Sequence, residues 1–270
     1  MLLKNKKCPN CESYYDPTLE QCPKCHNRNE LYAQRQVSDK IVFLHPAAQI
    51  GVFLIGFSFV GMLITEIIVS LAVRNVDQEN LKSALIFFFT YLLMFGGLLS
   101  VVFSTRRTTF VKKFTRGNDY LFGLAYAGGL YFTAILINII VGFFYQGTNA
   151  NQTAAVSLIQ NYPILAGIVI CLLGPICEEI TYRVGLYSFL SRIDKVLAAV
   201  VTVFIFTLIH FDFTAENMMG ELWSLPSYIA CGAVLTIAYM HRGPACSMTA
   251  HIVYNSLAML FILIGEIYGK

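Results

Sequence analysis

The sequence predicts an all-α polytopic membrane protein, with about seven or eight transmembrane helices and a small cysteine-rich head at the N-terminus. Three observations predict this class. Hydrophobic residues make up 56% of the 270 residues and charged residues only 13%, against about 25% in soluble domains. The mean hydropathy is +0.62. A run of 58 residues, 120–177, contains no Asp, Glu, Lys, Arg or His.

Seven apolar stretches are predicted as membrane spans, since an uncharged helix can cross the bilayer while satisfying its own backbone. They lie near residues 46–73, 83–105, 120–144, 157–191, 196–211, 223–240 and 245–264. The fourth stretch is long and is interrupted by Glu178, Glu179 and Arg183. An eighth crossing would arise only if this stretch were split in two.

Basic residues predict the orientation, because cytoplasmic loops retain Lys and Arg. A cytoplasmic N-terminus places 16 of the 19 Lys and Arg residues on the inner side, five of them in the segment RRTTFVKKFTR. The last outer loop, FDFTAENMMGE, carries acidic but no basic residues. No cleavable signal peptide is expected, because the N-terminus is polar and lacks an apolar stretch, so the first span would act as the signal.

Four of the eight cysteines form two C-x-x-C pairs, CPNC and CPKC. They are Cys8, Cys11, Cys22 and Cys25. Two such pairs separated by ten residues can present four thiolates tetrahedrally to one zinc ion, so the spacing predicts a structural zinc ribbon. A redox pair or a disulfide framework is the alternative, which a cytosolic head disfavours. His26 is an alternative ligand.

The predicted organisation is a zinc ribbon over 1–32, a polar linker over 33–45 and a transmembrane domain over 46–270. A head of about thirty residues is too small for a core of its own, so zinc would stabilise it. A four-thiolate site has no open position for catalysis, so the head is expected to bind a protein partner or to act as a cap. No nucleic-acid partner is expected, because the head has no basic stripe.

Ionisable residues inside the fourth span are the first candidates for a functional site, because such groups are costly in a bilayer and face the bundle interior. Glu179 and Arg183 are spaced i,i+4 and share a helix face, whereas Glu178 points about 100° away. Glu179 can therefore be neutralised by Arg183, in what could be a structural ion pair. Glu178 is left unpaired, which suits a general base.

Two more i,i+4 pairs lie in later spans, Phe206 with His210 and His251 with Asn255. Counted from the inner helix ends at about 1.5 Å per residue, Glu178, His210 and His251 lie roughly 20, 22 and 14 Å deep. Taken singly, a histidine buried in a span forms a structural hydrogen bond between helices as often as it serves a functional site. The shared depth favours one site near the middle of the membrane.

The stretches EEITYR, FTLIH and HIVYN resemble EExxxR, FxxxH and HxxxN, the three motifs of the CPBP intramembrane proteases. This family, also called Abi, includes the eukaryotic CAAX prenyl endopeptidases and bacterial proteins linked to bacteriocin maturation and immunity. The resemblance covers residues 163–264, with the motifs in the family order. The zinc-ribbon head is an addition outside the family core.

The resemblance implies six catalytic positions. They are Glu178, Glu179, Arg183, His210, His251 and Asn255. The first glutamate and the histidine of FTLIH would activate a water molecule, and the two polar residues of HIVYN would stabilise the oxyanion. The remaining glutamate and the arginine would support these groups.

The sequence also offers two other catalytic mechanisms, covalent catalysis and catalysis by a metal ion. Covalent catalysis needs a nucleophile beside a base, and Cys177, next to Glu178, is the only such neighbour and is not favoured. Two histidines and a glutamate can also form a catalytic zinc site with one open position, so the sequence leaves a catalytic metal open. The resemblance favours a glutamate-dependent mechanism without a metal over a metalloprotease.

These observations predict an intramembrane endopeptidase that hydrolyses a membrane-associated or lipid-modified peptide reached from the cytoplasmic side. Its partners would be membrane lipid and the peptide substrate, and a small chain with a fused zinc ribbon favours a prokaryotic plasma membrane. The alternative is a non-proteolytic membrane immunity or adaptor protein that binds partners through the zinc ribbon. A third class, an ion or solute carrier, is less favoured because no internal repeat is visible.

Overall fold

The computed structural model describes residues 6–16, 19–29, 41–57 and 63–268. The chain forms two compact units, 1–39 and 40–270. Most of the predicted linker, 33–45, lies outside the described residues, which resume at residue 41. The predicted boundaries of the ribbon, the linker and the transmembrane domain stay predictions.

The head contains a short two-stranded antiparallel sheet, in which β1 (Lys6–Lys7) pairs with β2 (Tyr14–Tyr15). Each C-x-x-C pair closes a tight turn. The residue after its second cysteine takes a positive φ, 58° at Glu12 and 56° at His26. In both turns the N–H group of that residue donates to the carbonyl of the first cysteine at 2.9 Å. The side chain of His26 is exposed.

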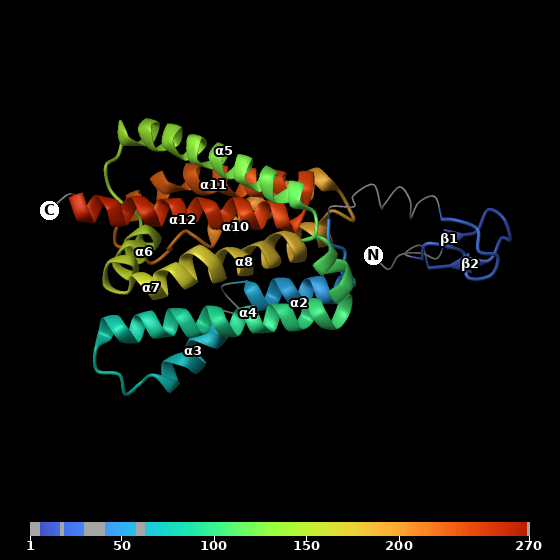
Figure 1. Cartoon of the computed structure of the whole chain (residues 1–270), viewed down its shortest axis with the longest axis horizontal. Helices are drawn as coiled ribbons and strands as arrows, with labels where there is room; N and C mark the ends of the chain where they lie inside the picture. The colour runs from blue at the N-terminus through green and yellow to red at the C-terminus, as the bar shows by residue number, and fades with distance from the viewer. Residues whose placement is uncertain (1–5, 17–18, 30–40, 58–62, 269–270) are drawn as a thin grey trace. The chain divides into compact units, whose positions relative to one another are not determined.

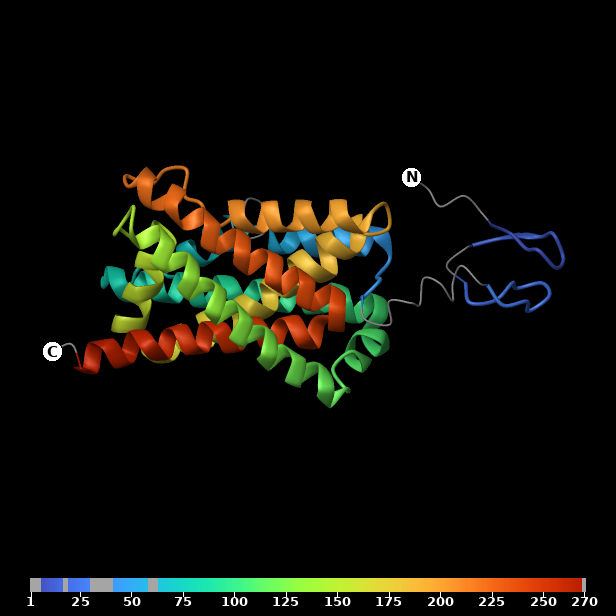
Figure 2. The same ribbon diagram turned by 90° about the horizontal axis from the view of Figure 1, so that it is seen from above.

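The second unit is a bundle of helices (Figure 1). It contains α2 (Pro46–Gly56), α3 (Leu63–Ala72), α4 (Glu79–Lys112), α5 (Gly117–Gly142), α6 (Ala150–Asn161), a composite helix over Pro163–Leu190, α10 (Lys195–Leu208), α11 (Met218–Arg242) and α12 (Pro244–Tyr268). The long helices run along the long axis of the bundle, and α12 packs beside both α5 and α11 (Figures 1 and 2).

Five helices in the described part of the chain are long and apolar enough to cross a membrane, which confirms the predicted all-α polytopic class. They are α4, α5, the composite helix, α11 and α12. Three shorter apolar helices, α2, α3 and α10, lie in the other stretches predicted as spans. The number of seven or eight crossings stays a prediction.

Two predicted spans are arranged differently in the structure. The first, 46–73, contains the two helices α2 and α3, and residues 58–62 between them lie outside the described part. The fourth, 157–191, begins its long helix only at Pro163, because Tyr162 takes a non-helical conformation (φ −140°, ψ 65°) before the proline. The residues that precede Tyr162 belong to the separate helix α6.

The composite helix changes its winding along its length. It consists of α7 (Pro163–Ala166), the π-helical η3 (Gly167–Leu173), α8 (Gly174–Glu178), the π-helical η4 (Glu179–Tyr187) and α9 (Ser188–Leu190). Every residue of η4 is buried. Since π-helical turns occur frequently at functional sites, the change of winding at the EEITYR motif is itself a sign of a site.

Two glycines allow η4 to lie close to α2. A Cβ at Gly185 would lie 3.1 Å from the α2 backbone, and a Cβ at Gly56 would overlap the hydroxyl group of Thr181. Gln49 of α2, which is fully buried, donates from Nε2 to the carbonyl of Val184 across this contact at 3.2 Å. The close approach fixes the motif helix in the bundle.

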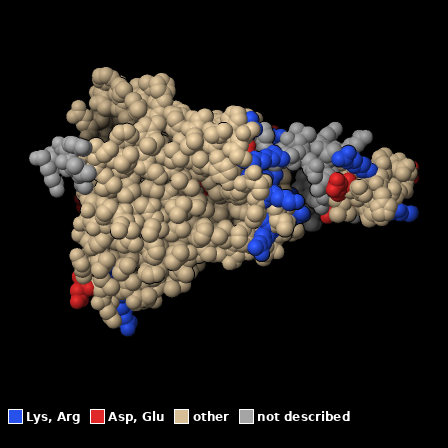
Figure 3. All heavy atoms as spheres, in the orientation of Figure 1, with Lys and Arg blue, Asp and Glu red and all other residues tan. Residues whose placement is uncertain are grey.

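Lys and Arg gather at the end of the bundle where α4 is followed by α5 (Figure 3). The basic residues of the loops and helix ends there are Arg106, Arg107, Lys112, Lys113, Arg116, Arg192, Lys195 and Arg242. We call this the basic end. The described basic residues at the opposite end are Arg74 and Lys82. The charge asymmetry predicted from the loops is therefore present in the folded bundle.

Candidate active site

A fully buried ion pair lies at the centre of η4. The Nη1 atom of Arg183 is 3.0 Å from Oε1 of Glu179, and neither side chain is exposed. Arg183 also donates from Nη2 to the carbonyl of Gly232 on α11 at 3.2 Å. Its guanidinium group lies over the ring of Phe206 on α10, 4.6 Å from the centroid. The pair predicted from the i,i+4 spacing therefore connects three helices.

His251 of α12 lies between the two glutamates. Its Nδ1 atom is 3.1 Å from Oε1 of Glu179, and its Nε2 atom is 3.8 Å from Oε2 of Glu178. An ionised carboxylate can only accept, so the nitrogen that bonds to Glu179 carries a proton. The imidazole is thereby held with its other nitrogen directed toward Glu178.

Glu178 differs from its neighbour in facing open space. Its side chain is 16% exposed and lines a cavity, whereas the side chain of Glu179 has no exposed surface. The Oε2 atom of Glu178 is buried and receives no hydrogen bond from the described residues. Because its side chain lines the cavity, the carboxylate of Glu178 is the one of the two that can accept a proton from a bound molecule.

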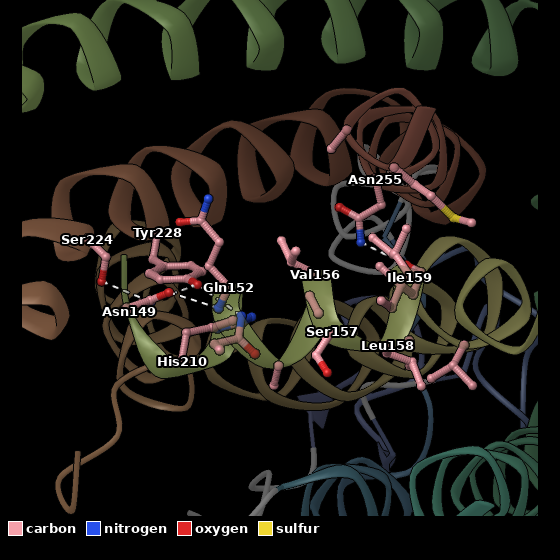
Figure 4. A pocket seen from close by; sticks show the side chains of 18 of the residues that line it. Asn149, Gln152, Val156, Ser157, Leu158, Ile159, His210, Ser224, Tyr228 and Asn255 are labelled. Atoms are coloured by element: carbon pink, nitrogen blue, oxygen red, sulfur yellow. Dashed lines mark hydrogen bonds between the residues drawn. The ribbon is translucent and has the colours of Figure 1, made fainter. Parts of the chain in front are cut away.

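His210 follows the last turn of α10 and presents one nitrogen as an acceptor. Its Nδ1 atom lies 2.8 Å from the carbonyl oxygen of Phe206. Because a carbonyl only accepts, Nδ1 carries the proton and Nε2 keeps a lone pair. The ring stacks on Tyr228 of α11, with centroids 4.5 Å apart and planes at 25°. Figure 4 shows the two rings near one end of α6.

Asn255 lies one helical turn after His251 and also lines the cavity (Figure 4). Its Nδ2 atom donates to the carbonyl oxygen of Ile170 in η3 at 2.9 Å. A side-chain amide nitrogen has two hydrogens, so one is left for a further acceptor. The amide is therefore fixed in orientation and still able to donate.

A cavity of about 710 Å³ joins these groups, a volume in the range of ligand-binding pockets. Four of the six predicted positions line it: Glu178, His210, His251 and Asn255. Glu179 and Arg183 lie behind this lining and touch it through His251 and Phe206. Helix α6 lies along the cavity and contributes lining residues over most of its length (Figure 4).

Two lining residues were missed in the sequence. The hydroxyl oxygen of Tyr228 accepts from Nδ2 of Asn149 at 3.1 Å, while its ring stacks on His210. Tyr228 lies in none of the three motifs, and no spacing relates α11 to the residues before α6. The amide-rich stretch 149–152 is the sequence signal that marks this part of the site. Cys177 is fully buried and is not among the residues that line the cavity.

The cysteines of the head form a second cluster. Among the described residues, they are the one set of at least three His, Cys, Asp or Glu whose ligand atoms all lie within 4.8 Å of one another. The Sγ atoms of Cys8 and Cys25 are 3.6 Å apart, as are those of Cys11 and Cys22. Four sulfurs in a tetrahedron about 2.3 Å from a zinc ion would be about 3.8 Å apart, so the cluster fits zinc.

The electrostatics of the head differ from one thiol to the next. At Cys25 a backbone hydrogen bond from Asn27 is outweighed by burial and by hydrogen bonds with Cys11 and Cys8, which raise the pKa to about 11. A hydrogen bond from the Ser13 hydroxyl group is the main cause that lowers the pKa of Cys22 to about 6. The thiolate is the form of cysteine that binds metal, so this residue is ready to act as a ligand at neutral pH. His26 does not belong to the cluster.

The bundle and its cavity define an integral membrane protein with carboxylate, imidazole and amide groups around an internal site. Residues 160–257, just over a third of the chain, match the family model of the Rce1-like type II CAAX prenyl endopeptidases. This segment contains all three motifs and is similar to the Rce1-like proteins of the CPBP family, so the resemblance seen in the sequence is confirmed over these residues. The match supports a CAAX-type intramembrane endopeptidase as the general class. No curated protein and no solved structure matches the chain.

Proposed function

We propose that the protein is an intramembrane endopeptidase that hydrolyses a peptide bond of a membrane-associated or lipid-modified peptide. The observation that carries this proposal is the convergence of Glu178, His210, His251 and Asn255 on one cavity inside an apolar bundle. Four polar groups, three of them titratable, drawn from three separate helical segments, are costly to keep in a membrane unless they serve a site. The match to a peptidase family supports hydrolysis as the reaction.

Glu178 and His210 are proposed to activate the attacking water. The carboxylate of Glu178 and Nε2 of His210 both line the cavity as acceptors, so a water molecule between them would donate one hydrogen bond to each. As the water oxygen bonds to the carbonyl carbon, its proton passes to Glu178. The same proton then moves to the nitrogen of the departing amine when the C–N bond breaks.

Asn255 and His251 are proposed to stabilise the oxyanion. The free hydrogen of the Asn255 amide can donate to it, and so can Nε2 of His251 when both ring nitrogens are protonated. Glu179 holds Nδ1 of His251, and Arg183 holds Glu179. These two residues would thus act by positioning His251, without touching the substrate.

A catalytic zinc held by the two histidines and Glu178 is the alternative chemistry for the same site. It is less well supported, because the ligand atoms of these three described residues do not all lie within 4.8 Å of one another. The two versions differ in metal content. With a structural zinc in the head and a glutamate-dependent reaction, the purified protein would hold one zinc ion per chain. A second ion that survives loss of the head site would favour the metalloprotease.

The proposal also includes the orientation of the protein and the type of membrane in which it lies. The basic end would face the cytoplasm of a prokaryotic cell, together with the N-terminal head. In the head, Cys8, Cys11, Cys22 and Cys25 would hold a structural zinc ion, which supplies folding energy to a unit of this size. A protein partner of the head is part of the adaptor alternative.

Two variants distinguish the peptidase hypothesis from the adaptor hypothesis. Glu178→Gln should abolish processing of membrane peptides while the protein accumulates normally. Cys8→Ser with Cys11→Ser should leave processing in place. If the cysteine variant instead removes the biological effect and Glu178→Gln does not, the adaptor is the better account.

A further inference from the structure

The cavity extends from the middle of the bundle into one of its halves. Its lining residues fall within 80–94 of α4, within 220–231 of α11 and within 251–262 of α12. The range in α4 lies in the half of that helix that is remote from the basic end, the range in α11 ends at the middle of its helix, and the range in α12 spans the middle of its helix. From the level of Glu178 and His251, the cavity therefore extends toward the end where α4 begins and α10 ends.

The other half of the bundle is closed by packing. Between the Glu179–Arg183 pair and the basic end, the rings of Tyr187 and Tyr239 lie 5.8 Å apart, and neither side chain is exposed. The hydroxyl groups of Ser188 and Tyr239 are 2.8 Å apart and are also buried. On this side, the described residues that line the cavity reach no further than Tyr182 of η4 and Cys231 of α11.

The distribution of charged residues also distinguishes the two halves of the bundle. None of the described lining residues is Lys or Arg, although eight such residues occupy the loops and helix ends of the basic end. The far end carries acidic residues, among them Asp77, Glu79, Asp212 and Glu216. Because basic loops stay in the cytoplasm, the cavity extends away from the cytoplasmic side.

We infer that the substrate enters from the non-cytoplasmic side of the membrane, which replaces the cytoplasmic access expected from the sequence. This inference rests on the proposed function and specifies its substrate class. The substrate would be a peptide that has been exported across the membrane or is held in its outer leaflet. Its scissile bond would reach Glu178 by passing α6, not by passing the basic loops.

The lining near the far end shows which side chains the peptide would carry. It contains amide and hydroxyl groups, including Asn149, Gln152 and Ser224, beside the apolar Val156 and Ile159 (Figure 4). Glu178 is the one carboxylate among the described lining residues, and no cation accompanies it there. A segment with apolar and uncharged polar side chains fits this lining, since a charged side chain inside the cavity would find no oppositely charged partner among the described lining residues except Glu178.

Cysteine labelling in sealed vesicles tests the side of access directly. Ala258 lines the cavity one turn beyond Asn255, and Thr108 is exposed between the arginines and lysines of the basic end. Ala258→Cys and Thr108→Cys would each be treated with a membrane-impermeant maleimide in right-side-out and in inside-out vesicles. Peptide mapping by mass spectrometry assigns the label to the introduced residue and not to a native cysteine.

The expected result is that Ala258→Cys is labelled only in right-side-out vesicles and Thr108→Cys only in inside-out vesicles. Labelling of both positions from one side, the reverse pattern, or no labelling of Ala258→Cys from either side would overturn the inference. The same labelling in a chain that also carries Glu178→Gln separates the two proposals. If the Glu178→Gln chain keeps the expected labelling pattern and the wild type cleaves no peptide, access from the non-cytoplasmic side is supported and the proposed peptidase activity is contradicted.

Discussion

The two halves of the transmembrane bundle use polar residues in opposite ways. In the packed half, Arg183 and Glu179 form an ion pair with no exposed surface. In the cavity half, Glu178 and His210 keep acceptor atoms that no described side chain occupies. The boundary between the halves falls between two consecutive glutamates. Neighbours in sequence can therefore differ completely in role, one serving stability and the other chemistry.

A large loss of activity is expected for His210→Gln, which removes an acceptor from the cavity half. We expect the rate of peptide cleavage to fall by about 10³-fold, within the range for a lost general base, with no change in the thermal unfolding of the protein in detergent. His241→Gln is the matched control, because His241 lies near the basic end, outside the cavity lining. Equal losses in the two variants would show that the cavity has no special role.

A large loss of stability, and not only of activity, is expected when the ion pair of the packed half is removed. Arg183→Met leaves the carboxylate of Glu179 buried beside only His251, which should cost about 3–5 kcal/mol of unfolding free energy. The double variant Glu179→Gln with Arg183→Met removes the uncompensated charge. Thermal unfolding should show partial recovery in the double variant, and a further loss would contradict this account of the pair.

A smaller loss of activity is expected for Asn255→Ala. Removal of one oxyanion donor should lower kcat by about 10²-fold and leave KM nearly unchanged, because the donor acts on the transition state. Asn138→Ala is the control, since Asn138 also lines the cavity but lies outside the three motifs. A rise in KM without a fall in kcat would place Asn255 in substrate binding and not in catalysis.

The smallest effect on activity is expected for the head. Cys8→Ser with Cys11→Ser should abolish zinc binding, measured as the metal content of the purified protein, because a structural zinc needs all four ligands. Cleavage should change by no more than about twofold, since the head is a separate compact unit. Zinc that remains bound to this purified variant would indicate a metal site in the cavity.

Much of the packed half could be predicted from the sequence. An uncharged run of 58 residues specifies membrane spans, and the i,i+4 spacing of Glu179 and Arg183 specifies their contact. The shared depth of Glu178, His210 and His251 also followed from counting residues along helices. These are local or one-dimensional properties, which a sequence carries directly.

The shape of the cavity half could not be predicted in this way. Hydropathy does not reveal that Tyr162 breaks the helix before Pro163, so α6 was joined to the next span. Nor does it reveal that Tyr228 stacks on His210, because that contact depends on how α11 packs against α10. The direction of the cavity depends on which half of each helix is filled by side chains, and this is a property of the packed bundle.

The most direct test of the central claim compares cells that express the wild type, Glu178→Gln or Glu66→Gln at matched protein levels. Glu66 is an exposed carboxylate of α3 that does not line the cavity, so it controls for loss of a charge within the membrane domain. Mass spectrometry of membrane and secreted peptides should show defined fragments with the wild type and Glu66→Gln that disappear with Glu178→Gln. Identical peptide profiles in all three would contradict the assignment of Glu178 as the group that activates water, and with it the peptidase.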